Sequence, residues 1–134
     1  MRLVVQRVSS AWVAVQGRRV AGIGPGLLVL AGIATGDSPA IVERLARRVA
    51  EVRIFEDGAG KMNLSAVDTG AEVLCVSQFT LYGDMRRGRR PSFDRAAPGP
   101  VAQPLFDRFC ESIEHTGLRC ARGVFGAEME VGLV

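Results

Sequence analysis

A hydrophobic run ends in a cluster of hydroxyl and amide side chains at residues 77–81, which read S-Q-F-T-L. Because side chains alternate along a strand, we expect Ser77 and Phe79 on one face and Gln78 and Thr80 on the other. A strand end of this kind can direct donors and acceptors into a pocket and hold a polar substrate there. The alternative is that these groups only form ordinary hydrogen bonds at the end of a strand.

Neither hydroxyl has a neighbour in the sequence that could activate it as a nucleophile. The single histidine, His115, lies near the predicted end of a helix, where we interpret it as a surface residue. A Ser-His-Asp triad would have to recruit this histidine. Asp84 and Asp94 stand among arginines and are interpreted as balancing charge. A small-ester hydrolase that uses Ser77 or Thr80 covalently therefore stays open only as an alternative.

The three cysteines, Cys75, Cys110 and Cys120, are widely spaced and form no C-x-x-C pair. With one histidine in the chain, a structural zinc site has too few ligands, so we expect neither a metal nor a cofactor. Cys75 lies in a hydrophobic run and is interpreted as a buried, reduced thiol. This use of cysteine is typical of a reducing cytoplasm.

The net charge of +3 is modest, but the cations are almost all arginine, with Lys61 the only lysine. Five arginines fall within residues 86–95, and the planar guanidinium group suits phosphate recognition. A solvated loop that faces Asp84 and Asp94 explains the same cluster equally well. The candidate phosphate ligands are Arg86, Arg87, Arg89 and Arg90.

The rest of the chain predicts the elements that position these groups. The order of patterns favours an α/β or α+β fold, a single domain over 1–134 in which two helices pack on sheets. No apolar run approaches the roughly 20 residues that cross a bilayer. The expected strands are 3–8, 11–16, 20–23, 27–33, 72–79 and 129–133, and the expected helices begin at Pro39, with Ser38 as cap, and near Val101.

Six blocks of the sequence, in their order and spacing, resemble the D-aminoacyl-tRNA deacylases. They are Gln6-Arg7-Val8, Gly26-Leu27-Leu28-Val29-Leu30, Arg53-Ile54-Phe55, Gly60-Lys61-Met62-Asn63-Leu64, Ser77-Gln78-Phe79-Thr80-Leu81 and Arg90-Pro91-Ser92-Phe93.

The resemblance implies a homodimer with a layered β/β/α, barrel-like fold and an active site near the subunit interface. It implies hydrolysis of the ester that joins a D-amino acid, or glycine, to the 3′ adenosine of tRNA, as translation quality control. No cofactor, membrane or DNA partner is expected. In such enzymes the pocket orients the ester, and the 2′-OH of the RNA is thought to help activate water.

The resemblance also assigns roles. Ser77, Gln78 and Thr80 would form the catalytic segment, with Gln78 and the backbone at Phe79 and Thr80 holding the substrate and the reacting water. Phe79 and Leu81 would contact the substrate. Three residues outside the segment complete the assignment: Arg7 would order the pocket and an element of the partner subunit, Phe93 would line the adenine site, and Met129 would lie near the pocket, with core packing as its alternative.

A second family motif, a Gly-cisPro segment that excludes L-amino acids, should follow the last strand. We therefore expect a C-terminal hairpin past Val134 in the natural chain. The segment Pro98-Gly99-Pro100-Val101-Ala102 precedes a helix instead and is interpreted as the loop that begins it. Besides the ester hydrolase, a non-catalytic tRNA- or RNA-binding domain and a truncated, inactive paralogue remain as alternatives.

Overall fold

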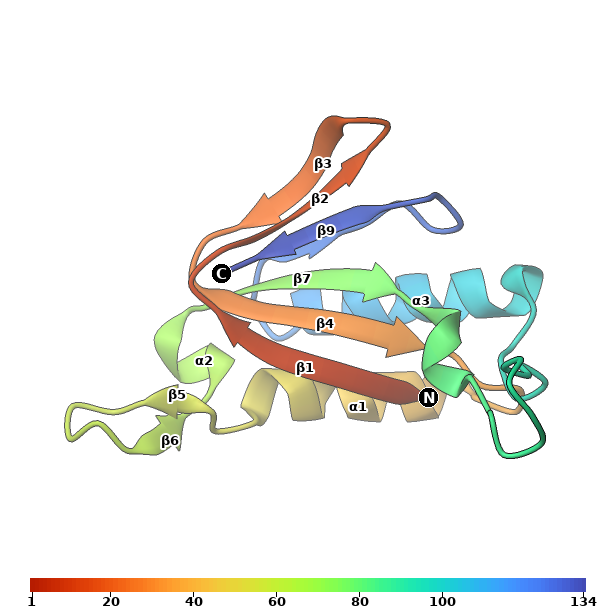
Figure 1. Ribbon diagram of the computed structural model, residues 1–134. Helices are drawn as coiled ribbons and strands as arrows, with labels where there is room; N and C mark the ends of the chain where they lie inside the picture. Colours follow the sequence, from red (N-terminus) through yellow and green to blue (C-terminus); the bar gives the residue numbers. More distant parts are fainter.

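The protein, described over residues 1–134 by a computed structural model, has three layers. Its two larger sheets have three and four strands. Figure 1 shows the smaller one stacked on the larger one, whose other face is covered by α1 (Pro39–Glu51) and α3 (Gly99–Glu114). The β/β/α layering expected from the sequence is confirmed. No helix is long and apolar enough to span a membrane.

The four-stranded sheet has the order β1-β4-β7-β8, and its central strands β4 and β7 run parallel. The three-stranded sheet has the order β3-β2-β9, and β5 and β6 form a separate hairpin. Both larger sheets are open, each with two unpaired edge strands, so neither closes into a barrel. The strands are β1 (Arg2–Val8), β2 (Ala11–Val15), β3 (Arg18–Ile23), β4 (Gly26–Gly32), β5 (Phe55–Glu56), β6 (Met62–Leu64), β7 (Glu72–Ser77), β8 (Cys120–Arg122) and β9 (Glu130–Leu133).

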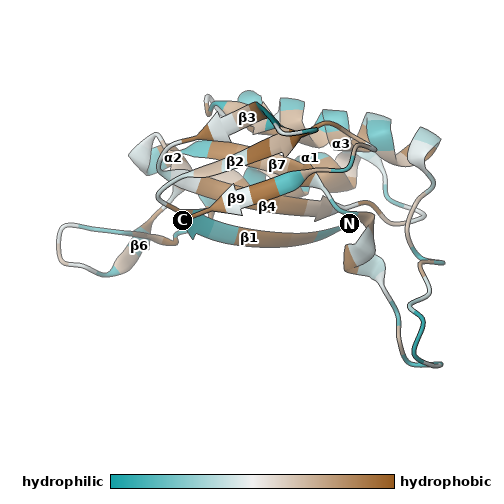
Figure 2. Cartoon of the chain, turned by 45° about the horizontal axis from the view of Figure 1, so that its top comes forward, coloured by the Kyte–Doolittle hydropathy of each residue, from teal (hydrophilic) through white to brown (hydrophobic).

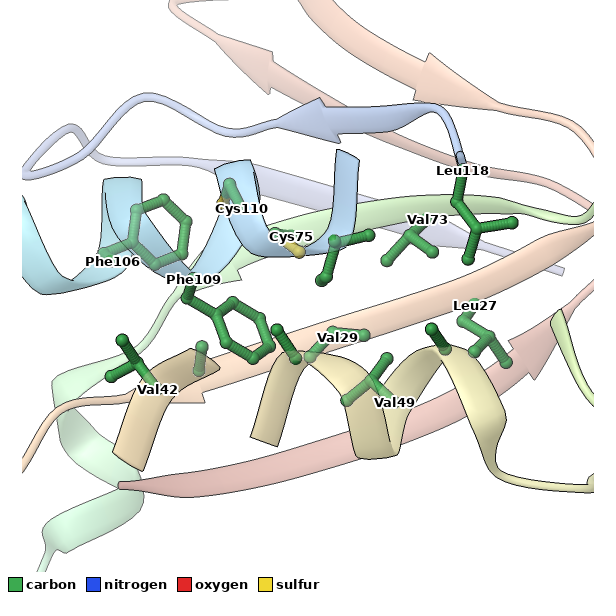
Figure 3. Packing of buried hydrophobic residues seen from close by; sticks show 14 of the residues in the cluster. Leu27, Val29, Val42, Val49, Val73, Cys75, Phe106, Phe109, Cys110 and Leu118 are labelled. Carbon is green, nitrogen blue, oxygen red and sulfur yellow. The ribbon is translucent and has the colours of Figure 1, made fainter. Parts of the chain in front are cut away.

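The core has two parts because β4 and β7 are covered on both faces. Alternate residues of β4 face opposite layers: Leu27 and Val29 pack against the helices, and Leu28 packs between the sheets. On the helix side, Phe106 and Phe109 of α3 fill the space above the sheet (Figure 3). Figure 2 shows hydrophobic residues along the strands of both sheets, whereas the loop of residues 83–98, on the side of the molecule where the N-terminus lies, carries hydrophilic ones.

Both predicted long helices are present. Ser38 caps α1, accepting a hydrogen bond from the Ile41 N–H, with Pro39 in the first turn as expected. The second helix begins at Gly99, two residues before its expected start, with Pro100 in its first turn. The segment 98–102 thus begins the helix, as expected, but residues 99–102 already form its first turn and are not a loop. The short helix α2 (Ala66–Thr69) was not predicted; its capping box is formed by Ser65 and Asp68.

The strand expected over 72–79 ends at Ser77, and the 3₁₀ helix η1 (Phe79–Tyr82) follows it. The strand alternation predicted for Phe79 and Thr80 was therefore wrong. Gly32 at the end of β4 explains the turn: a Cβ there would lie 3.0 Å from the Gln78 carbonyl oxygen and 3.3 Å from the Tyr82 ring. The missing side chain gives η1 room to pack over the end of the sheet, where Tyr82 is buried.

Candidate active site

The parallel strands β4 and β7 end at the same edge of the sheet, and a cavity of about 530 Å³ opens there. This is the edge at which α/β proteins usually bind ligands. The start of α3 and the segment before β9 close the other sides. The lining residues are Ala31, Ile33, Val76, Ser77, Gln78, Phe79, Ala97, Gly99, Ala102, Phe125, Gly126, Ala127, Met129 and Val131.

The catalytic segment expected from the sequence lies at the mouth of this cavity. Ser77 and Gln78 line it and are half-buried, whereas Thr80 is exposed. The Gln78 side-chain amide donates a hydrogen bond to the Thr80 hydroxyl. This contact holds the carboxamide at the opening and leaves its carbonyl oxygen and one N–H free for a ligand. Gln78 and Thr80 thus lie in contact because the chain turns into η1 after Gln78, and not because they share a strand face.

Two aromatic rings form a wall beside the cavity. The Phe79 side chain is 56% exposed, an unusual position for a large apolar ring, and it packs edge to face against Phe93 at 5.0 Å between ring centroids. The two residues come from segments 14 positions apart in the sequence. Their exposed faces could stack on a flat ligand such as a nucleobase.

Met129 lies where the sequence analysis placed it, on the cavity wall and half-buried. It also packs on the core cluster between the two sheets, so both interpretations describe its position. Leu81 lies in η1 behind the opening, and its backbone carbonyl accepts a hydrogen bond from Arg2. It does not line the cavity.

Arg7 is not part of this cavity. It faces Leu27 across β1 and β4, at the opposite end of the sheet from Ser77. Its guanidinium donates a hydrogen bond to the Ile54 carbonyl oxygen at 2.9 Å and approaches Glu56. Within one chain, Arg7 can therefore not order the pocket, and a role in it would require a second subunit.

Arg2 and Arg95 support the site. Arg2 was missed from the sequence, and Arg95 was expected only as a member of the arginine cluster over residues 86–95. The Arg2 guanidinium lies 4.8 Å from the centroid of the Tyr82 ring and the Arg95 guanidinium lies 5.8 Å from it, which places both cations on the aromatic side chain that anchors η1. Burial is the main cause of the raised pKa of Tyr82, so its hydroxyl stays neutral. No local motif marks Arg2, because its partner is 80 residues away.

The candidate phosphate ligands all lie on the exposed loop between η1 and α3. Arg86 is already paired: its Nε lies 2.9 Å from both carboxylate oxygens of Asp84. This hydrogen bonding lowers the pKa of Asp84 to about 2. Arg87, Arg89 and Arg90 form no ion pair, so the loop presents three free guanidinium groups to solvent.

The cavity contains no carboxylate, imidazole or amine among its lining residues. Neither Ser77 nor Thr80 therefore has a base that could activate it, which argues against a covalent mechanism. His115 is exposed at the end of α3, and its Nδ1 lies 2.7 Å from the Glu111 carbonyl oxygen. The site does offer hydrogen-bond donors. The first N–H groups of a helical turn have no acceptor within the turn, and in η1 these are the N–H groups of Phe79 and Thr80.

The fold and the cavity together define a layered β/β/α protein with a cavity at the ends of two parallel strands. Two solved structures have this architecture. One, described as a c-Myc DNA unwinding element binding protein, is 39% identical, has a TM-score of 0.92, and is matched over 99% of this chain and 91% of its own. The other, a probable eukaryotic D-amino acid tRNA deacylase, is 18% identical with a TM-score of 0.85 over 98% of this chain and 92% of its own, and shows the fold alone.

The sequence model of the D-Tyr-tRNA(Tyr) deacylase family matches residues 4–134. Two relatives named D-aminoacyl-tRNA deacylase match the whole chain. The protein of Thermomicrobium roseum is 54% identical and is covered over 87% of its length, and that of Myxococcus xanthus is 53% identical and is covered over 88%. The chain belongs to the D-Tyr-tRNA(Tyr) deacylase family, as its sequence blocks indicated.

Proposed function

We propose that this protein hydrolyses the ester bond between a D-amino acid, or glycine, and the 3′ adenosine of tRNA, and so removes such residues before translation uses them. The observation that carries the proposal is the cavity at the ends of β4 and β7, whose mouth holds the segment 77–81. Its polar groups can bind an ester but cannot supply a nucleophile, which favours attack by water on a positioned substrate.

The backbone and one side chain would stabilise the negative charge that develops on the ester during hydrolysis. The N–H groups of Phe79 and Thr80 would donate to the carbonyl oxygen of the ester, which becomes an oxyanion as water attacks. Gln78, held by its hydrogen bond to Thr80, would orient the substrate or the water. The 2′-OH of the terminal ribose lies next to the ester in the substrate itself and can assist proton transfer to or from the water.

The aromatic wall and the arginine loop would bind the RNA. Phe93, packed on the exposed Phe79, would stack on the terminal adenine, and the free guanidinium groups of the loop would meet phosphates of the acceptor stem. The arginines of the loop lie next to the aromatic wall because Phe93 belongs to the same loop, three residues after Arg90. One substrate could therefore contact both features at once.

We further propose that the protein works in the cytoplasm as a homodimer. The cysteines are free thiols, in keeping with a reducing compartment. Arg7 is exposed at the far end of the sheet, where only a second subunit could bring it to a pocket. Light scattering coupled to gel filtration is expected to give twice the chain mass, and a monomer at working concentration would contradict the dimer.

The direct test of the function is deacylation of matched D-Tyr-tRNA, L-Tyr-tRNA and Gly-tRNA by this chain. Loss of the D-ester with the L-ester spared is the expected result. Loss of both would show a hydrolytic pocket that lacks chiral selection. Binding of tRNA with no turnover would leave an RNA-binding module and contradict the proposal. Acylation of the protein by a simple ester would instead favour a covalent hydrolase.

We expect tRNA to bind more weakly, and its affinity to depend less on salt, when the three free arginines of the loop are replaced together by glutamine. These are Arg87, Arg89 and Arg90. Three lost phosphate contacts should reduce the slope of log affinity against log salt by about 2 to 3 units. The measurement is tRNA binding by fluorescence anisotropy over a series of salt concentrations.

The matched control replaces three exposed arginines on the outer face of α1, Arg44, Arg47 and Arg48, by glutamine. This variant changes the net charge by the same amount but leaves the loop intact. An equal loss of affinity in both variants would show that only net charge matters, and the loop would then lose its assigned role.

A further inference from the structure

The three cysteines come together in the fold although they are widely spaced in the sequence. Cys75 lies on β7, Cys110 on α3, and Cys120 begins β8. Their Sγ atoms all lie within 4.8 Å of one another, and those of Cys75 and Cys120 are 3.6 Å apart. Figure 3 shows Cys110 and Cys75 next to each other between α3 and the sheet. The cluster lies in the helix-side core, outside the residues that line the cavity.

The spacing of the three sulfur atoms suits one metal ion bound by all of them. A thiolate sulfur binds a d¹⁰ cation at about 2.3 Å, so three sulfurs in a plane around one ion lie about 4 Å apart. The 3.6 Å between the Cys75 and Cys120 sulfur atoms, and the limit of 4.8 Å on all three separations, lie on either side of this value. A disulfide would need two of the sulfurs to approach to about 2 Å and would leave the third unpaired.

The composition of the cluster selects the kind of ion. It contains only sulfur, with no carboxylate or imidazole in the set, and all-sulfur ligands favour soft cations. Zinc prefers four protein ligands in a closed site, and the set offers three. A cation that is stable with three thiolates, Cu(I), therefore suits the site better than zinc does.

Burial and charge are compatible with this occupant. Cys75 and Cys110 are fully buried, whereas Cys120 is half-buried and gives an ion a path from solvent. Arg122 follows Cys120 on β8, and its guanidinium forms an ion pair with Glu114 at 3.0 Å. The guanidinium lies close to Cys110 and Cys120, and its positive charge would offset part of the charge of the thiolates.

We propose that Cys75, Cys110 and Cys120 form a binding site for one thiophilic metal cation, with Cu(I) as the preferred occupant. The ion would join α3 to β7 and β8, two strands that already pair with each other in the sheet. Binding to the folded state alone would raise its thermal stability. The ion would also fix Cys75, which lies two residues before Ser77 on the strand that carries the catalytic segment.

The test is a titration of the reduced full chain with Cu(I) under anaerobic conditions, in competition with a chromogenic Cu(I) chelator, and with Zn(II) in parallel. We expect one Cu(I) per chain, an X-ray absorption spectrum with three sulfur ligands, a raised Tm, and weaker binding of Zn(II). Binding of Zn(II) more tightly than Cu(I) would overturn the assignment of Cu(I). Failure of the chain to compete with the chelator would overturn the site.

Variants identify the ligands. Cys120→Ser changes the half-buried cysteine. Removing a residue that only contacts a metal ligand lowers metal affinity by roughly 10- to 100-fold, and we expect the loss of this direct ligand to lower the affinity for Cu(I) by more than that. Cys110→Ala provides a second ligand variant, and circular dichroism of each metal-free protein checks its fold. Met62→Leu, which removes an exposed sulfur far from the cluster, should bind Cu(I) unchanged. Wild-type affinity in both cysteine variants would overturn the proposal.

Discussion

Gln78→Ala is expected to lower kcat/KM for D-aminoacyl-tRNA by about 100- to 1,000-fold, the usual effect of removing one preorganised hydrogen-bonding group from a hydrolytic site. Gln78 lines the cavity and its amide is held by Thr80, so its position does not depend on the substrate. Because the side chain contributes no bond to the core, the free energy of unfolding should stay within about 0.5 kcal/mol of the parent value. Deacylation kinetics and urea unfolding measure the two effects separately.

The control for this variant is Gln103→Ala, which removes the same side chain from an exposed position on α3. It should be fully active. Thr80→Val is an intermediate case, since it keeps Gln78 but removes the hydroxyl that accepts its hydrogen bond, and a smaller loss is expected. A folded Gln78→Ala protein with the activity of the parent would exclude Gln78 from the reaction and leave the backbone N–H groups as the only candidates.

The parts of the fold that follow from local patterns were predictable. The cap at Ser38, the proline after it and the apolar stripe of α1 all lie within a few residues of one another, so the sequence places this helix accurately. The central strands β4 and β7 were found as continuous apolar runs because both of their faces are buried. The segment 77–81 was found as a candidate site because the polar residues Ser77, Gln78 and Thr80 come where the apolar run of β7 ends.

The geometry of the site itself was not predictable in this way. The turn from β7 into η1 depends on Gly32, which lies 46 positions earlier and leaves the space that η1 occupies. The contact of the Arg2 guanidinium with the Tyr82 ring likewise joins two residues that lie 80 positions apart in the sequence. The cysteine cluster brings together three elements, and no spacing rule for a metal motif covers it. Each of these features is set by tertiary packing and has no signature in the local sequence.

Phe109→Ala is expected to lower the free energy of unfolding by about 3 to 5 kcal/mol, which is a large part of the roughly 5 to 15 kcal/mol that stabilises a typical domain. Phe109 is 0% exposed and extends from α3 toward Val29 and Val42, at the point where α1 and α3 meet the sheet (Figure 3). Its removal leaves a cavity that the helices, both tied to the sheet, cannot close fully. Urea or thermal unfolding measures the loss.

The activity of the Phe109→Ala protein separates this effect from that of Gln78. Phe109 does not line the active-site cavity, so kcat per folded molecule should equal that of the parent at low temperature and fall only as the folded fraction falls. Val101→Ala, on the exposed face of the same helix, should change stability by less than about 0.5 kcal/mol. A fall in kcat of fully folded Phe109→Ala protein would show that the helix layer positions the catalytic segment as well as stabilising the sheet.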